Sequence, residues 1–259
     1  PPRTKADSGG TDSETLAASP IRPPALAGSW YDGDSATLRK AISDLLAKVP
    51  AADYSGYPVA LLVPHAGHRF SGAMAARAYA TLKGRTYGRV FILGPAHRTA
   101  LKGIAFPTGI THFETPLGQI PLAVDVLDEL RKEPLFVDHP SAHRTEHSIE
   151  IHLPFLQLVL PHGFQLVPMV VSGLNRAEID VAAAALRRVV RPGDLLIASS
   201  DFTHYGERFD YLGPAGKEFG PAAAKVRLQG LLDSAWLTIE KLDATAFLRH
   251  KVETRDTIC

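Results

Sequence analysis

Cysteine is nearly missing from this chain of 259 residues, because Cys259 is the only one. A single cysteine cannot close an internal disulfide, so the sequence is not that of a disulfide-stabilised secreted scaffold. A reducing, cytoplasmic setting fits best. The cysteine itself has two readings: a small buried hydrophobic residue, or a thiolate ligand brought to other donors by the fold. Its spacing along the chain does not decide between them.

Net charge and long apolar stretches are missing too. The formal net charge is +1 at pH 7, which argues against a large surface for nucleic acid or an anionic membrane. No apolar run approaches the ~20 residues that a membrane-spanning helix needs. We therefore expect no nucleic-acid partner and no membrane partner.

The beginning of the chain has few apolar side chains. Residues 1–20 are small and polar and show no signal-peptide pattern. Because such a segment has little to bury, we expect a disordered tail over residues 1–23 and one ordered domain over residues 24–259. No interior linker is long or polar enough to divide that domain.

Several common catalytic signatures are absent. The sequence has no Walker motif, no GxGxxG after a predicted strand and no HExxH. Phosphate-loop, Rossmann and zincin chemistry are therefore unsupported.

What the chain does contain is an alternation of apolar strands and helices. Strands are expected at 59–63, 90–93, 164–171 and 195–199, with shorter ones near 104–106 and 135–137. Between and around them we expect a helix capped by Ser35 and helices over 72–82, 122–133, 176–190, 215–233 and 240–250. This order predicts an α/β fold: a single domain with a central, mainly parallel sheet flanked by helices.

Two histidines follow predicted strands directly. His65 comes after the run VALLV, and His97 comes after RVFIL and a Gly-Pro-Ala turn. Ligands of open α/β sheets bind beyond the carboxyl ends of the strands, so we expect both imidazoles at one edge, on adjacent strands. A metal site or an acid/base site is the functional interpretation. The alternative for each is a histidine whose ring bonds to the backbone.

A third strand end carries Asp201 and His204. The carboxylate could orient a histidine ring, and His204 could act as a general acid or base. The competing interpretation makes Asp201 a helix N-cap.

The segment beginning at Glu146 contains further donors. His147 and Glu150 are three residues apart and His143 and His147 are four apart, which places each pair on one helix face. A solvated polar face is the alternative. Trp30, Tyr31 and Asp32 could wall a pocket, with core packing as the alternative, and His68, Arg69 and Ser71 line the first loop. Four histidines look peripheral: His112, His139, His162 and His250.

A set of segments, taken in order, resembles one family. They are AGSWYDGD at 27–34, PHAGHRFSG at 64–72, FILGPAHR at 91–98, TPLG at 115–118, EHSIEIHLPFLQ at 146–157, SSDFTHYG at 199–206 and DTIC at 256–259. Together they look like the Memo family (mediator of cell motility), called AmmeMemoRadiSam system protein B in bacteria. The resemblance implies a Memo-like domain over residues 24–259 with a fold similar to class III extradiol dioxygenases, which are non-haem iron enzymes.

The resemblance also implies roles for residues. His65, His97 and Cys259 fall on the family's metal-site positions. Asp201 and His204 fall on its SSDxxH segment, and His147 lies in the EHSIE segment near the same cleft. We take His204, Asp201 and His147 as candidate catalytic residues. Where the related dioxygenases have a carboxylate ligand, this chain has Cys259, so their reaction does not transfer automatically.

The function implied is that of a metal-binding protein, redox-active or of oxidoreductase type, with a single transition metal: Fe(II) or copper first, zinc as the alternative. Two other functions stay open: a non-catalytic peptide- or protein-binding module with a cleft for a phosphotyrosine-like peptide, and a zinc hydrolase. The ligand is an unidentified small molecule or peptide, and the bacterial name suggests radical-SAM and AMMECR-type partner proteins.

Two departures from the family pattern stand out. Position 68 is a histidine where an aromatic residue such as tyrosine is expected, so His68 could add a ligand or change the polarity of the pocket. The family pattern also continues beyond its Thr-Ile-Cys motif, so we expect the domain to lack its C-terminal end here.

Overall fold

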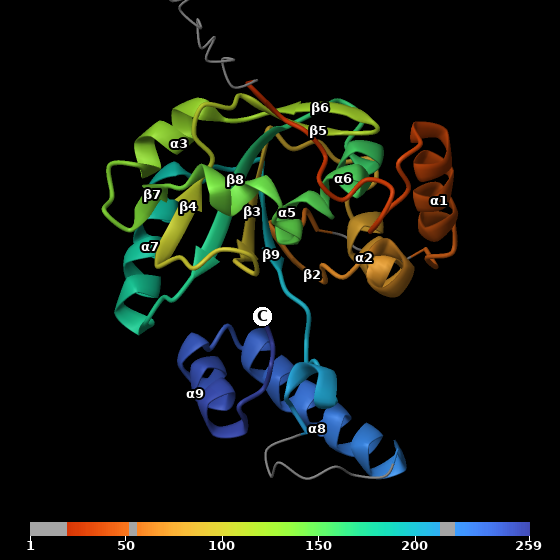
Figure 1. The fold of residues 1–259 in the computed structure, drawn as a ribbon, viewed down its shortest axis with the longest axis vertical. Helices are drawn as coiled ribbons and strands as arrows, with labels where there is room; N and C mark the ends of the chain where they lie inside the picture. The colour runs from red at the N-terminus through yellow and green to blue at the C-terminus, as the bar shows by residue number, and fades with distance from the viewer. Residues whose placement is uncertain (1–19, 52–55, 213–220) are drawn as a thin grey trace, which may run out of the picture.

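The computed structural model describes residues 20–51, 56–212 and 221–259 (Figure 1). Its main sheet has the strand order β2-β9-β3-β8-β4-β7. The strands are β2 (Ala60–Val63), β9 (Asp194–Ser199), β3 (Arg89–Pro95), β8 (Gln165–Ser172), β4 (Gly103–Phe106) and β7 (Phe136–Asp138). Every neighbouring pair is parallel except β4 and β8. The predicted α/β class with a mainly parallel central sheet is confirmed.

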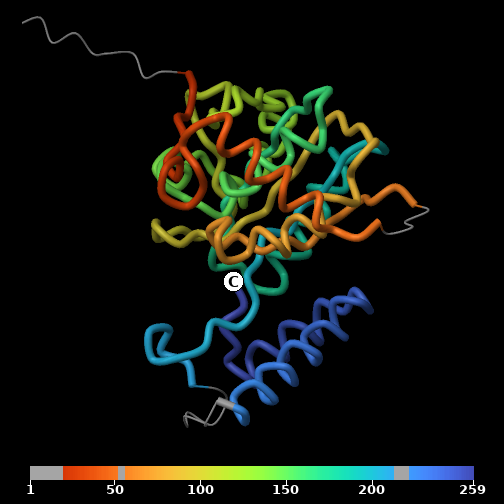
Figure 2. Tube along the Cα trace, turned by 90° about the vertical axis from the view of Figure 1, so that its right-hand side faces the viewer, coloured from red at the N-terminus to blue at the C-terminus, as the bar shows by residue number. Residues whose placement is uncertain are grey.

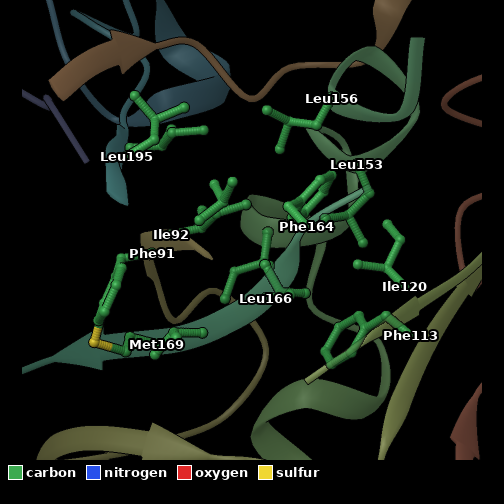
Figure 3. Packing of buried hydrophobic residues seen from close by; sticks show 14 of the residues in the cluster. Phe91, Ile92, Phe113, Ile120, Leu153, Leu156, Phe164, Leu166, Met169 and Leu195 are labelled. Carbon is green, nitrogen blue, oxygen red and sulfur yellow. The ribbon is translucent and has the colours of Figure 1, made fainter. Parts of the chain in front are cut away.

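The core lies on both faces of this sheet because the central strands are mostly apolar between their polar end residues. Figure 3 shows Leu166 of β8 among Ile92 of β3 and Leu153 of the helix α6 (Leu153–Val159), and all three side chains are buried. Such strands can form only where helices cover them on each side, which fixes the layered arrangement.

Two groups of helices provide that cover. The helices α1 (Ser35–Ala47), α2 (His68–Ala80) and α6 pack together beside β2, whereas α3 (Val124–Leu130) packs on α7 (Arg176–Val189) at the other end of the sheet (Figure 1). Asp34 caps α1, since its carboxylate accepts from Thr37 N. The expected cap at Ser35 is therefore one residue late. The helix α2 starts four residues before the predicted 72, directly after the loop that carries His65.

A second, small sheet was not predicted. It joins β1 (Ile21–Arg22), β5 (His112–Thr115) and β6 (Gly118–Pro121). The pairing of β5 with β6 is a hairpin around the predicted turn at 115–118. The expected tail over 1–23 lies mostly outside the described residues, but the described chain is already a strand at residue 21. This strand is held in place because the Arg22 guanidinium is buried against Glu150.

The segment after Glu146 is divided into two helices close to Pro154. A short helix α5 (His147–Glu150) ends before α6, whose first turn contains the proline. Proline fits the first turn of a helix because its missing N–H would have no partner there. A separate short helix α4 (Pro140–Arg144) precedes α5.

The last two helices lie to one side of the sheet. They are α8 (Pro221–Glu240) and α9 (Ala244–Thr254), which pack on each other (Figures 1 and 2). The expected start of α8 at 215 falls outside the described residues, and the helix runs seven residues past the expected end at 233. After α9 the chain returns to the carboxyl end of β9, where Cys259 lies. Across the described ranges, none of the helices combines the length and apolar composition that crossing a bilayer demands.

Candidate metal centre

Three strands deliver the predicted site residues to one edge of the sheet. His65 follows β2, Asp201 follows β9 and His97 follows β3. These strands are parallel, so their carboxyl ends meet at the same edge. One expectation was wrong in detail: β9 lies between β2 and β3, so the two histidines do not follow adjacent strands. Both histidines nevertheless lie at the same edge of the sheet, at the carboxyl ends of its parallel strands.

The C-terminal segment carries Cys259 to this edge. Thr257 Oγ1 donates to the His204 carbonyl and accepts from His204 N, and Cys259 N donates to the Asp201 carbonyl at 3.2 Å. As a result Cys259 Sγ lies 3.2 Å from His65 Nε2. One ligand atom each from His65, His97 and Cys259 all lie within 4.8 Å of one another.

His65 is almost fully buried and is held on two sides. Its backbone N–H donates to Asp201 Oδ1 at 2.7 Å, and its Nδ1 lies 2.8 Å from Ser199 Oγ. Asp201 therefore fixes the loop after β2, which is a structural role that the sequence did not separate from a catalytic one.

His97 lies at the rim and is held by one carboxylate. Glu146 accepts from the His97 backbone N–H at 2.7 Å, and its Oε1 lies 2.9 Å from His97 Nδ1. The same carboxylate caps α5, because it also accepts from the backbone of His147 and Ser148. Since it accepts so many hydrogen bonds, the pKa of Glu146 falls to about 2 although burial opposes this.

The site electrostatics favour a thiolate beside an imidazolium. Burial raises the pKa of the Cys259 thiol, but hydrogen bonds with His65 and His97 outweigh it and lower the pKa to about 6. Burial lowers the pKa of His97, but hydrogen bonds with Cys259 and Glu146 outweigh it and raise the pKa to about 9. Cys259 thus has the character of a ligand rather than of an inert core residue.

His147 stands beside the three candidate ligands. Its ring stacks on His97 at 4.3 Å between centroids, and the Trp30 ring covers it at 4.4 Å. Burial, followed by the charge on His97, lowers the pKa of His147 to about 4, so the ring is neutral near pH 7. Its Nδ1 is buried with no hydrogen-bond partner, although it lies 3.1 Å from Glu146 Oε1. His147 is therefore the one candidate catalytic histidine with an unused buried nitrogen.

His204 is close to the centre but tied to the C-terminal segment. Its Nδ1 lies 3.2 Å from the Thr257 carbonyl, so this nitrogen donates. Its Nε2 lies 3.8 Å from Asp201 Oδ2, and the same oxygen lies 3.9 Å from His65 Nε2. The three predicted strand ends therefore do converge, with Asp201 between two imidazoles.

Other candidates have structural roles. His143 donates from Nε2 to the Ala105 carbonyl, so it does not share a site with His147. Glu150 binds Arg22, Tyr31 and two backbone N–H groups. His68 contacts the Ile151 carbonyl, not the candidate ligands. His250, expected at the periphery, is buried against Asp256.

Sequence reasoning missed the residues behind the two imidazoles. Ser199 was placed only in a strand and in the SSDFTHYG segment, and Glu146 only at the start of the EHSIE segment, neither with a role of its own. The signal for Glu146 was its place just before a short helix, because a carboxylate there can cap the helix and reach the next strand end. Nothing in the sequence marks Ser199.

Comparison with known families decides where the chain belongs. The family described as Memo-like protein matches residues 22–259. The chain belongs to the Memo family. A MEMO1 family protein of Thermoplasma volcanium is 35% identical to it over 229 residues, which are 87% of this chain and 81% of that protein. Protein MEMO1 of Homo sapiens is 28% identical over 245 residues, 92% of this chain and 80% of that protein. The memo-1 homolog of Caenorhabditis elegans is 31% identical over 242 residues, 92% and 67% of the two chains.

Proposed function

We propose that this Memo-family protein holds a single transition-metal ion between His65, His97 and Cys259. The observation that carries the proposal is the cluster of two ring nitrogens and one sulfur within 4.8 Å of one another. Imidazole nitrogen and thiolate sulfur are donors that Zn(II), Cu(I) and Fe(II) accept. The lowered pKa of Cys259 adds to this, because a metal binds the thiolate and not the thiol.

Iron or copper is proposed first and zinc second, so the protein would be a redox-active metalloprotein of oxidoreductase type. A bound iron or copper ion would supply one-electron redox chemistry. The likeness of the family fold to non-haem iron enzymes supports this order, whereas the thiolate in place of a carboxylate separates the site from theirs.

The surrounding residues would handle protons and exclude water. His147 is neutral near pH 7 and has an unpaired buried nitrogen, so it could accept a proton. Trp30 covers that ring and keeps bulk water from one side of it. His204 and Asp201 would form the second proton-handling pair, since His204 Nε2 lies 3.8 Å from Asp201 Oδ2 and a proton taken up on Nε2 would face that carboxylate.

A peptide-binding module is the second candidate, and a groove of about 480 Å³ next to the centre favours it. Its lining residues include the rings of Trp30 and Tyr31, the cationic side chains of Lys48 and Arg69 and the carboxylates of Asp32 and Asp44. Aromatic rings beside cationic side chains suit an aromatic anion such as a phosphotyrosine side chain. A zinc hydrolase is the third candidate, because two histidines and one cysteine leave a fourth position for water.

Metal analysis tests the proposal. Protein purified without added metal is expected to retain close to one equivalent by mass spectrometry, and His65→Ala with His97→Ala is expected to retain none while staying folded. The matched control is His139→Ala with His162→Ala, which removes two imidazoles outside the centre. If the site variant keeps as much metal as the control, the ligand assignment is wrong.

The identity of the metal separates the three candidates. Iron or copper with oxygen consumption supports the oxidoreductase, zinc with hydrolysis of a test ester supports the hydrolase, and peptide binding without metal supports the binding module. A cytoplasmic location and association with radical-SAM and AMMECR-type proteins remain proposals that come from the family resemblance.

A further inference from the structure

Two side chains contact the imidazole rings of the candidate ligands His65 and His97 at Nδ1, the ring nitrogen opposite the one that would bind a metal. Ser199 Oγ lies 2.8 Å from His65 Nδ1, and Glu146 Oε1 lies 2.9 Å from His97 Nδ1. Both side chains are buried. Their chemistry decides which nitrogen of each ring carries the proton.

The directions of the two hydrogen bonds made by the Ser199 hydroxyl can be assigned in only one way. A serine hydroxyl has one proton, and Ser199 Oγ lies 2.5 Å from the Ser148 carbonyl, which can only accept. The hydroxyl proton therefore points to Ser148, and Ser199 must accept from His65 Nδ1. The proton of a neutral His65 ring is then on Nδ1, and the lone pair is on Nε2, which faces Cys259.

Glu146 imposes the same arrangement on His97. An ionised carboxylate only accepts hydrogen bonds, and both oxygens of Glu146 already accept from backbone N–H groups, Oε2 from His97 and Oε1 from His147 and Ser148. His97 Nδ1 must therefore donate, which leaves Nε2 as the nitrogen that can bind a metal.

Ser148 connects the two contacts through its own backbone. Its carbonyl accepts from Ser199, and its N–H donates to Glu146 Oε1 at 3.0 Å. Its hydroxyl donates to the Pro95 carbonyl of β3, on the strand that leads to His97. The space around it is closed: a Cβ added at Gly94 would lie 2.5 Å from Ser148 Oγ. The two acceptors are thus held by one rigid, fully buried residue.

We propose that Ser199 and Glu146 are positioning residues that hold a proton on Nδ1 of both rings, so that Nε2 is the nitrogen of each ring that a metal can bind, and that Ser148 couples them. This inference rests on the proposed metal site, whose two Nε2 atoms it orients. Fixing the second ring nitrogen also stops each ring from rotating away from the centre. Removing such an acceptor from a metal-binding histidine costs about 10–100-fold in metal affinity.

The first experiment measures zinc affinity by competition with a chromophoric chelator. Ser199→Ala is expected to bind zinc about 10–100-fold more weakly than the parent, and Ser199→Thr, which keeps a hydroxyl, is expected to recover most of the loss. The matched control is Ser200→Ala, because Ser200 Oγ contacts only the Asp201 carbonyl. Equal affinities for Ser199→Ala and Ser200→Ala would overturn the role of Ser199.

The second experiment reads the tautomer directly and needs no metal. Long-range proton–nitrogen NMR of metal-free protein at pH 8, in a Cys259→Ala background, is expected to show His65 protonated at Nδ1. Adding Ser199→Ala is expected to produce a mixture with the Nε2 form, and Glu146→Ala tests His97 in the same way. An unchanged spectrum refutes the inference even if metal binds. If the parent binds no metal, the proposed function fails, but the spectrum still decides the tautomer.

Discussion

The single cysteine makes the electrostatics of the site measurable with little ambiguity. In metal-free protein we expect Cys259 to titrate with a midpoint near pH 6, because hydrogen bonds with His65 and His97 lower its pKa from the ordinary 9.0 to about 6. At pH 7 this means about 90% thiolate, against about 1% for an unperturbed thiol. No other cysteine in the sequence can react.

The rate at a single pH would be a poor readout. The thiolate fraction rises about 90-fold, but the nucleophilicity of a thiolate whose pKa is three units lower falls by about 15- to 30-fold. The net rise in rate at pH 7 is therefore only about 3- to 6-fold. The midpoint of the alkylation rate against pH, measured with iodoacetamide and mass spectrometry from pH 4 to 10 on chelator-treated protein, is therefore the quantity that decides.

His97→Gln provides the perturbation. It removes the ring that bonds Cys259, so the midpoint is expected to move up toward the ordinary value. His162→Gln, at an exposed position outside the site, is the control and should leave the midpoint unchanged. A midpoint of 8 or higher in the parent protein would refute the electrostatic reasoning, as would an unshifted midpoint in His97→Gln.

The pKa shifts of Cys259 and His97 also determine how the stability of the metal-free protein changes with pH. The pKa of Cys259 is lower in the folded protein, so its contribution to the free energy of unfolding is lost as the pH falls through about 6. The pKa of His97 is higher in the folded protein, so its contribution is lost as the pH rises through about 9. Metal-free protein should therefore exceed Cys259→Ala in stability most clearly between these pH values.

Three further outcomes are expected. Glu150→Ala leaves the buried Arg22 guanidinium without its carboxylate and should lower the free energy of unfolding by about 3–5 kcal/mol in urea titrations; a loss under 1 kcal/mol would contradict the buried pair. Gly94→Ala should lower the free energy of unfolding by about 1–3 kcal/mol, because the added methyl group would collide with the α5 turn. The control Gly230→Ala has open space around it in α8 and should be neutral or stabilising by up to about 1 kcal/mol. Similar losses of stability in both variants would contradict the steric argument. His204→Gln should keep the metal content of the parent and slow any metal-dependent turnover found by an oxygen-consumption screen; loss of metal would instead make His204 a ligand.

The layered fold could be predicted because its strands are short, continuous apolar runs that can only be buried on both faces. The edge of the sheet where His65, His97 and Asp201 meet followed from parallel topology alone. The position of β9 between β2 and β3 did not, since nothing in a strand's own composition states which strand pairs with it. The hairpin β5–β6 was missed because its strands, HFET and GQIP, are not apolar runs.

The candidate ligands could be predicted from the sequence, but the residues that orient them could not. A histidine after a strand is visible as a pattern, whereas Ser199 matters only because the Ser148 carbonyl lies 2.5 Å away. Arg22 was placed in the disordered tail because it directly follows the small, polar segment 1–20. Its burial depends on Glu150, which is 128 residues further along the chain. Contacts between distant residues of this kind leave no local signature.

The separation of 194 residues between His65 and Cys259 affects how cooperatively the protein unfolds. A metal ion held by both would act as a removable cross-link that closes most of the chain into one loop, and such a link restricts the unfolded chain more as the loop grows. It would also tie the pair α8–α9 to the sheet through the short segment after Thr254. Chelation should then release that pair ahead of the rest, visible as faster amide exchange in α8 and α9 than in β3, whereas a loaded protein should unfold as one unit.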